Sequence, residues 1–308
     1  MLGPVFLAAA RSSGIRRVVS AAPVTRAMVD RFVAGEELAD CLAVVSALEQ
    51  RGLRVTVDHL GEDTRDKQEA QRNRDAYLAL AEALAGTGMG ERAELSVKLS
   101  AFGQALPGGH DIALANVSEV VEAAAAAGTA VTLDMEDHTT VDSTLAIHAE
   151  LRKRFPETGA VLQSYLFRSE DDCRALAEGG ARVRLVKGAY DEPASVAFRD
   201  KREVDRAFVR CLKLLMAGEG YPMVGSHDPR MVAIAQELAR RADRKPGEYE
   251  FQMLFGIREA EQQRLVAEGH RMRVYVPYGT DWYGYFMRRL AERPANVAFF
   301  LRSLVTNG

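Results

Sequence analysis

The 308-residue sequence is short of the residues that build disulfide frameworks and metal centres. Its three cysteines, Cys41, Cys173 and Cys211, are far apart and form no CxxC pair, which excludes a zinc knuckle and fits a reducing compartment. No run of apolar residues approaches the length needed to span a bilayer. We therefore expect a soluble, cytoplasmic protein without disulfides.

A large net charge is missing as well. The formal net charge of −3 gives no bulk attraction for nucleic acid or for an anionic membrane, so anion binding must depend on a local cluster of cations. The first residues, MLGPVFLAAARSSGIRR, have no positive segment before the apolar run. This order favours a leader or a first helix over a cleaved secretory signal.

The sequence has ample material for a core, with 47% hydrophobic and 27% charged residues. Between residues 25 and 51, apolar residues recur at three- and four-residue steps around a break at Gly35, as in helices. We therefore expect an N-terminal helical segment over residues 1–52, followed by a catalytic domain over residues 53–308.

From residue 53 onward, short apolar runs alternate with longer amphipathic stretches, such as 66–85 and 196–216. Eight such units predict an α/β fold of the (βα)8 barrel type. An open doubly wound sheet is the alternative, but it starts from a glycine fingerprint after its first strand, whereas the candidate GTGMG at 86–90 follows a helical stretch. The predicted strands lie within 53–62, 94–103, 130–137, 160–167, 182–190, 222–228, 249–256 and 271–279.

Nearly every predicted strand begins with apolar residues and ends with polar ones. In a barrel these carboxyl ends converge on one mouth, where catalytic residues are placed. A structural protein has no reason to gather charge there, so the pattern indicates an enzyme. The polar strand-end residues are Asp58, Glu62, Lys98, Ser100, Asp134, Glu136, Gln163, Lys187, Tyr190, His227, Gln252 and Tyr275.

Two of these strand ends carry opposite charges. A buried Asp134 needs a partner charge or hydrogen bonds, and Lys98 could supply them, although a lone strand-end lysine often reaches solvent. The carboxylates that follow Asp134, with His138 and His227, raise the question of a metal site. The histidines are few and include no HxH pair, so we expect no metal.

The segment RLVKGAY, residues 184–190, gathers Arg184, Lys187 and Tyr190, and Gly188 permits close approach of the backbone. Lys187 could form a Schiff base, as in barrel aldolases, or bind the phosphates of a cofactor. It could also be an ion-pairing strand end, which the density of cationic and aromatic groups disfavours.

The segment YGYFMRRLAE, residues 283–292, follows the eighth predicted strand. Tyr285, Arg288, Arg289 and Glu292 are spaced to share one helix face. An exposed Arg288–Glu292 pair is the simplest interpretation of that face. A helix that begins at the barrel mouth can instead aim both guanidiniums at a carboxylate, which arginine binds in fork geometry.

Taken together, these motifs resemble the proline dehydrogenase family, the FAD-dependent barrel enzymes of proline catabolism. The likeness covers nearly the whole chain in the right order, and VKGAY and YxxRRLxE are its most specific elements. It is similar to the monofunctional form, because no aldehyde dehydrogenase domain follows in this sequence. The matching segments are SVKLSAFG, LDMED, LQSYL, VRLVKGAY, GSHD, EFQMLFG and VYVPYGTDWYGYFMRRLAE.

The resemblance implies hydride transfer from C5 of L-proline to N5 of FAD, which yields pyrroline-5-carboxylate in the first step of proline catabolism to glutamate. It also implies a quinone acceptor at the inner face of the membrane and a separate dehydrogenase for the product. The catalytic residues would be Lys98, Asp134 and Arg184. The substrate would contact Lys98, Tyr275, Tyr285, Arg288, Arg289 and Glu292. FAD would contact Asp134, Gln163, Arg184, Lys187, Gly188, Ala189, Tyr190, Ser226, His227 and Gln252.

One departure from the family pattern is GSHD, where Ser226 and Asp228 replace the usual Thr and Asn; an aspartate would repel a nearby phosphate. We further expect the loop carrying Asp58 and Glu62 to fold over the mouth and pair with an arginine of the last helix. Two other functions stay open: a Schiff-base lyase that uses Lys187, and an inactive barrel that serves as a binding module.

Overall fold

A computed structural model of the protein describes residues 29–61 and 64–291, without the side chains from residue 288 onward. The expected leader or first helix lies outside the described residues. So do Glu62 and Glu292, and the side chains of Arg288 and Arg289. No helix in the described part of the chain is long and apolar enough to cross a membrane.

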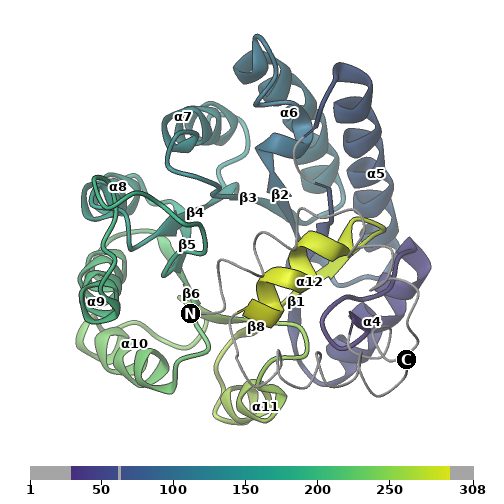
Figure 1. The fold of residues 1–308 in the computed structure, drawn as a ribbon. Coiled ribbons are helices and arrows are strands. Elements are labelled where there is room, and N and C mark those ends of the chain that lie inside the picture. Colours follow the sequence, from purple (N-terminus) through teal and green to yellow (C-terminus); the bar gives the residue numbers. More distant parts are fainter. Residues whose placement is uncertain (1–28, 62–63, 292–308) are drawn as a thin grey trace, which may run out of the picture.

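Eight parallel strands close into a barrel in which β1 pairs with both β2 and β8, so the predicted (βα)8 fold is confirmed (Figure 1). Each observed strand falls within, or within one residue of, its predicted run. Closure places all eight carboxyl ends at one mouth. The strands are β1 (Arg54–His59), β2 (Ala93–Lys98), β3 (Ala130–Asp134), β4 (Gly159–Gln163), β5 (Arg182–Val186), β6 (Tyr221–Gly225), β7 (Glu250–Leu254) and β8 (Met272–Tyr278).

A helix follows each strand, and the helices before the last one form a ring outside the barrel (Figure 1). Aspartates cap several of them: the Asp66 carboxylate, for example, accepts a hydrogen bond from the backbone N–H of Glu69 at 2.8 Å. The helices are α4 (Leu38–Gln50), α5 (Lys67–Gly86), α6 (Gly109–Ala126), α7 (Val141–Arg152), α8 (Ser169–Glu178), α9 (Lys201–Ala217), α10 (Pro229–Arg241), α11 (Glu259–Ala267) and α12 (Trp282–Ala291). Short 3-10 turns lie at Gly90–Arg92 and Leu99–Phe102.

Helix α9 begins five residues later than the sequence pattern predicts. The preceding residues, 191–200, fold back as a loop in which Ala197 forms an antiparallel bridge with Leu166. Asp200 then caps α9 by accepting hydrogen bonds from the backbone N–H groups of Arg202 and Glu203. The predicted helix start at residue 196 was therefore wrong, because tertiary pairing takes that segment.

The barrel interior is polar from one end to the other. Alternate strand residues point outward to the helices and are apolar, such as Val55, Val57 and Val97, which are fully buried. The buried polar strand residues are Thr56, Asp58, Glu94, Ser96, Lys98, Thr132, Asp134, Gln163, Arg184, Glu250, Gln252 and Arg273. The sequence indicated polar residues at the mouth, whereas the structure extends them to the amino ends of the strands.

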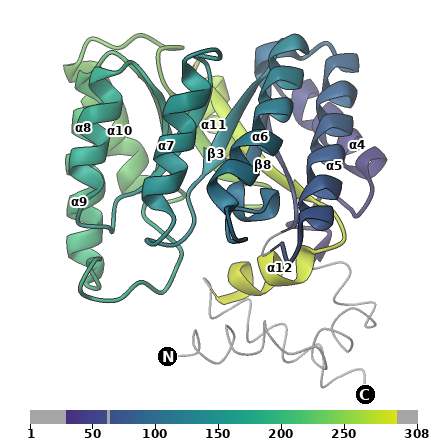
Figure 2. The ribbon, with the colours of Figure 1, turned by 90° about the horizontal axis from the view of Figure 1, so that it is seen from above.

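The last helix, α12, lies across the mouth of the barrel (Figures 1 and 2). Trp282 and Phe286 pack edge to face, 6.0 Å apart, within an apolar cluster that also holds Phe32 from the segment before α4. Trp282 Nε1 donates a hydrogen bond to Glu36 at 3.1 Å. The described part of the N-terminal segment is thus tied to the mouth, and the division at residue 52 stays a prediction.

Candidate active site

Three strand-end side chains meet at the mouth on one side of the barrel. Lys98 Nζ lies 2.6 Å from Asp58 Oδ2, and the Tyr275 hydroxyl donates to the same oxygen at 2.6 Å. Tyr77, from α5, lies with its hydroxyl 3.1 Å from Asp58 Oδ1. These contacts make Asp58 the nearest counterion of Lys98.

The Asp58 contacts correct two expectations. Asp58 is buried inside the barrel as part of β1, so it does not belong to a loop that folds over the mouth. Lys98 and Asp134 do pair, at 3.7 Å, but this distance is longer than that between Lys98 and Asp58. The register explains the change, because β1 and β3 both flank β2 and Lys98 lies between their ends.

Asp134 is held mainly by groups other than Lys98. Its Oδ1 accepts hydrogen bonds from Ser96 Oγ at 2.8 Å and from Arg184 Nη1 at 2.7 Å. Its Oδ2 faces the Tyr275 hydroxyl at 2.8 Å. The three residues predicted to be catalytic, Lys98, Asp134 and Arg184, are therefore together in one hydrogen-bonded network.

Burial and charge act in opposite directions on this network. Burial alone would raise the pKa of Asp58, but the charge of Lys98 and the hydrogen bonds from Lys98 and Tyr275 outweigh it and lower that pKa. Burial, followed by the nearby charges of Asp134 and Asp58, raises the pKa of Tyr275 well above its usual range. Asp58 is therefore an anion and Tyr275 a neutral hydroxyl near neutral pH.

Arg184 links the mouth to a deeper layer of charges. Its Nη2 lies 3.2 Å from Glu94 Oε1, while its Nη1 holds Asp134. The guanidinium also lies over the Tyr275 ring, 5.5 Å from the ring centroid. Arg184 is buried, and no described residue accepts a hydrogen bond from its Nε.

Further residues predicted to contact the cofactor line the same mouth. Gln163 ends β4 and donates from Nε2 to the backbone carbonyl of Glu136 at 2.7 Å. Gln252, on β7, donates from Nε2 to Glu250 at 2.6 Å, while its Oε1 is buried without a partner among the described residues. The structure thus brings β4, β5 and β7 residues to one place, as the sequence predicts.

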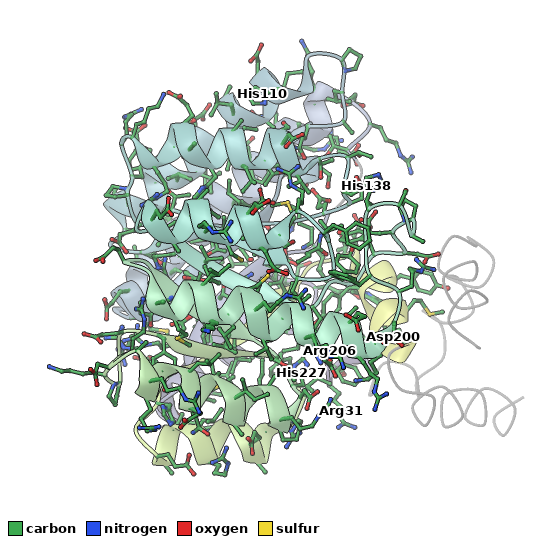
Figure 3. All side chains as sticks on the ribbon, turned by 90° about the vertical axis from the view of Figure 1, so that its left-hand side faces the viewer. Arg31, His110, His138, Asp200, Arg206 and His227 are labelled. Carbon is green, nitrogen blue, oxygen red and sulfur yellow. The ribbon has the colours of Figure 1, made fainter. Side chains whose placement is uncertain are left out.

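His227 and Ser226 follow β6. His227 Nε2 accepts a hydrogen bond from the backbone N–H of Leu254 at 2.9 Å, so this nitrogen holds the end of β7. Figure 3 shows His227 and His138 on the side of the molecule that α12 covers. Ser226 is buried, and its Oγ accepts from the backbone N–H of Asp228 at 3.2 Å.

Lys187 is an ion-pairing residue, which is the interpretation that the sequence disfavoured. Its Nζ lies 2.5 Å from Asp205 on α9 and 3.2 Å from Asp228. Asp228 also pairs with Arg230 at 2.7 Å and caps α10. The repulsion that Asp228 would exert on a nearby phosphate is therefore reduced, because the cations of Lys187 and Arg230 offset its charge.

The loop after β5 is fitted closely to its neighbours. Gly188 has a φ of +120°, and a Cβ atom there would come within 2.4 Å of the Tyr165 ring. Ala189 is exposed and Tyr190 is half-buried in the same loop. Only glycine fits at position 188, as the prediction of a close backbone approach requires.

The sequence did not reveal all residues that shape the mouth. Glu192 is buried, and it accepts hydrogen bonds from the backbone N–H of His138 at 2.9 Å and from the His138 ring. The Tyr165 hydroxyl lies 3.4 Å from the same carboxylate. Glu192, Tyr165 and Tyr77 come from loops and a helix, so no strand-end pattern marks them.

The substrate-binding predictions can be placed in part. Tyr275 lies in the network, and Tyr285 is buried on α12 in the apolar cluster against which Tyr275 packs. Arg288 and Arg289 belong to α12, but their side chains lie outside the described residues. Among the described residues, no three His, Cys, Asp or Glu side chains are grouped as a metal site.

Comparison with known proteins settles the family. A family model described as "Proline dehydrogenase" matches residues 41–302. The chain belongs to the proline dehydrogenase family. Proline dehydrogenase 1 of Bacillus subtilis is 39% identical over 305 residues, which cover 99% of each chain. Proline dehydrogenase of Deinococcus radiodurans is 39% identical over 281 residues, or 90% of each chain.

Solved structures agree with this proline dehydrogenase assignment. Proline utilization A (PutA) from Bdellovibrio bacteriovorus, in a crystal structure of the protein inactivated by N-propargylglycine, matches with a TM-score of 0.81 and 28% identity. The match covers 87% of this chain and 33% of that longer chain. The predicted enzyme class and barrel fold are thus confirmed. The Bacillus and Deinococcus relatives are matched over at least 90% of their own length.

Proposed function

We propose that this enzyme oxidises L-proline to pyrroline-5-carboxylate with FAD as its cofactor. The observation that carries the proposal is the network of Lys98, Asp134 and Arg184 at the mouth of a barrel that belongs to the proline dehydrogenase family. FAD bound there would accept a hydride from substrate C5 at its N5 atom. The protein would supply binding, orientation and exclusion of water.

The fit of a flavin rests on polar groups that lack partners. Arg184 Nε, Gln252 Oε1 and Ser164 Oγ are buried without a hydrogen-bond partner among the described residues. Such groups are costly in a folded protein unless a ligand or water satisfies them. Ser164 directly follows β4, and Arg184 and Gln252 are the middle residues of β5 and β7. Together with Gln163, Lys187, Gly188, Ala189, Tyr190, Ser226 and His227, they are the residues that would hold FAD.

The substrate carboxylate would bind to Arg288 and Arg289 of α12, with Lys98 nearby. A carboxylate fits the guanidinium fork, which gives both affinity and orientation. Tyr275 and Tyr285 would enclose the pyrrolidine ring, and Glu292 would hold the arginine pair. A loop with Glu62 would close over the mouth. Arg184 would hold the flavin near N5, and Asp134 would fix Arg184.

The proposed electron acceptor is a membrane quinone, which a cytoplasmic enzyme would meet at the inner face of the membrane. The product would pass to a separate pyrroline-5-carboxylate dehydrogenase. Support for a separate second enzyme comes from a longer relative: Bifunctional protein PutA of Escherichia coli is 30% identical over 319 residues, which cover 24% of that protein.

The contacts of Lys187 weaken the Schiff-base alternative. Two carboxylates lie 2.5 and 3.2 Å from its Nζ, so a carbonyl substrate would have to displace an existing ion pair before it could reach this amine. Borohydride trapping with a carbonyl substrate would reveal a lyase. A binding module without activity would not require polar strand ends of this density.

The proposed function is tested by a dye-reduction assay with FAD-reconstituted protein and L-proline. We expect proline-dependent dye reduction, and we expect Arg288→Lys to raise KM at least about 10-fold because lysine cannot form the fork. Arg240→Lys, an exposed pair on α10, is the matched control and leaves KM unchanged. A protein that reduces no dye with proline contradicts the proposal.

A further inference from the structure

Oxidation of proline requires the loss of a proton from nitrogen as well as a hydride from carbon. The substrate amine is an ammonium near neutral pH, and its nitrogen can form a C=N bond only after it has regained its lone pair. Some group in the mouth must therefore take the proton. The two oxygens of Asp134 differ in a way that bears on this step.

Oδ1 of Asp134 accepts two hydrogen bonds, whereas Oδ2 has one hydroxyl neighbour, which it shares with Asp58. Oδ1 accepts hydrogen bonds from Ser96 Oγ at 2.8 Å and Arg184 Nη1 at 2.7 Å. Oδ2 faces the Tyr275 hydroxyl oxygen at 2.8 Å, and Lys98 Nζ is 3.7 Å away. Oδ2 is therefore the oxygen with capacity to take a proton.

The Tyr275 hydroxyl cannot satisfy both of its carboxylate neighbours. It lies 2.6 Å from Asp58 Oδ2 and 2.8 Å from Asp134 Oδ2, but it carries a single proton. When it donates to Asp58, its lone pair faces the Asp134 oxygen. One more proton, placed between Asp134 and Tyr275, would complete a continuous chain of hydrogen bonds.

We propose that Asp134 Oδ2 accepts the proton that the substrate amine loses, and that Asp58 holds Tyr275 and Lys98 in position for this step. This inference rests on the proposed oxidation of proline. The N–H bond breaks and its electron pair stays on nitrogen, while the proton forms an O–H bond on Asp134. The C5–H bond then breaks and its electron pair leaves with the hydride, and the nitrogen lone pair forms the C=N bond.

After the transfer, the Asp134, Tyr275 and Asp58 oxygens form a continuous chain of hydrogen bonds. The Asp134 O–H donates to the Tyr275 oxygen, the Tyr275 O–H donates to Asp58, and Lys98 balances the charge of Asp58. Asp58 is the poorer acceptor, because its Oδ2 already lies 2.6 Å from Lys98 Nζ, whereas Asp134 Oδ2 lies 3.7 Å from it. Asp58 is thus a positioning residue.

Charges around Asp134 also favour the transfer once the substrate is bound. The charged groups that face it are Lys98 from β2, Arg184 from β5 and Asp58 from β1, with Tyr275 from β8. Arg184 also pairs with Glu94 of β2 at 3.2 Å, so part of its charge is already offset before the substrate binds. The substrate ammonium adds a charge in a site from which water is excluded, and burial disfavours charged forms. Proton transfer converts the ammonium and the carboxylate into two neutral groups.

The test is the pH dependence of kcat/KM for L-proline. In the parent enzyme, kcat/KM should level off near neutral pH. In Asp134→Asn it should fall about 100-fold or more at neutral pH and then rise tenfold per pH unit, because only proline that is already neutral at nitrogen can react. Ser96→Ala removes one of the two hydrogen bonds to Oδ1 and a 2.9 Å contact with Arg184 Nη1, but it leaves Oδ2 untouched. It is the matched control and should keep the plateau.

Lys98 is the rival proton acceptor, and Lys98→Arg tests it independently of whether Asp134→Asn folds. Arginine keeps the charge but is not deprotonated in this pH range. A plateau in Lys98→Arg supports Asp134, and its loss overturns the inference. A plateau in a folded, flavin-loaded Asp134→Asn enzyme overturns it as well.

A second substrate distinguishes loss of the proton acceptor in Asp134→Asn from a general loss of active-site structure. Thiazolidine-4-carboxylate has a less basic amine than proline and is largely neutral at nitrogen near neutral pH. Asp134→Asn should therefore lose much less activity with it than with proline, whereas equal losses contradict the inference. If the parent enzyme oxidises no proline, the proposed function itself fails, which is a distinguishable outcome.

Discussion

Arg184 shows how one side chain can serve both stability and the site. It pairs with Asp134 at 2.7 Å toward the mouth and with Glu94 at 3.2 Å toward the amino end of the barrel. Glu94 also binds Arg182 at 2.8 Å. Buried charges of this kind are tolerated because each has partners on more than one strand.

Glu94 should make the protein sensitive to acid. Burial alone would raise its pKa, but Arg273, Arg182 and Arg184 lower it from 4.5 to about 2. A folded pKa below the unfolded value contributes stability above about pH 4.5, and this contribution is lost as the pH falls toward 2. Glu94→Gln should flatten the dependence of the free energy of unfolding on pH in that window. An unchanged slope in urea titrations would argue against the assigned ion pairs.

Gly188 should not tolerate a side chain. An alanine there would adopt a φ of +120° and bring its Cβ within 2.4 Å of the Tyr165 ring. We expect Gly188→Ala to weaken FAD binding about 10-fold or more, measured by quenching of flavin fluorescence, because the loop must shift. The control is Gly180→Ala, which also has a positive φ of +63° but open space around its Cβ. Equal FAD affinity in both variants would contradict the close fit.

Among the elements, α12 is the one that closes the mouth. Its apolar face packs on residues 29–33 and Leu60, so the segment before α4 and the residue that follows β1 both support it. Helix position could be predicted from the eighth strand and the aromatic residues that follow. The support from residues 29–33 could not be predicted, because it depends on contacts between two segments that are far apart in the sequence.

Removal of the anchor of α12 should affect both stability and substrate binding. Phe286 is fully buried, and Phe286→Ala should lower the free energy of unfolding by about 3 kcal/mol. It should also raise KM for proline, because Arg288 and Arg289 lie on the same helix. Phe167→Ala is the control, since Phe167 is 48% exposed and its loss should change stability by less than about 0.5 kcal/mol. Equal effects of the two changes would show that α12 is not anchored in this way.

Across the whole molecule, the charged interior of the barrel links strands that are distant in sequence. Arg273 on β8 is fully buried and binds Glu250 on β7 at 2.7 Å and the backbone carbonyl of Val55 on β1 at 2.8 Å. The first and last strands, whose pairing closes the barrel, are therefore joined also by a buried cation with several partners.

Arg273→Met should destabilise the fold strongly without touching the mouth. The change leaves the Glu250 carboxylate buried without its cation, which costs about 3–5 kcal/mol of the free energy of unfolding. Arg240→Met breaks an exposed pair with Glu237 and should leave the denaturation midpoint unchanged. If both variants unfold at the same denaturant concentration, the buried pair does not stabilise barrel closure.

The barrel could be predicted from sequence because each strand and helix leaves its own local pattern, and the carboxyl ends of parallel strands must meet. The hydrogen-bond and ion-pair partners of the side chains within the mouth could not be predicted. The sequence suggests Asp134 as the partner of Lys98, but closure of the barrel brings Asp58 nearer, at 2.6 Å. Lys187 was given no counterion, because Asp205 and Asp228 come from a helix face and a loop whose orientation no local pattern fixes.

The central claim is that proline reduces a flavin held at the mouth of this barrel. The most direct measurement is the visible absorption spectrum of the FAD-reconstituted protein, recorded anaerobically before and after addition of L-proline. We expect a flavin spectrum that is bleached by proline and restored by a quinone analogue. A protein that binds no flavin, or a flavin spectrum that proline leaves unchanged, would contradict the account.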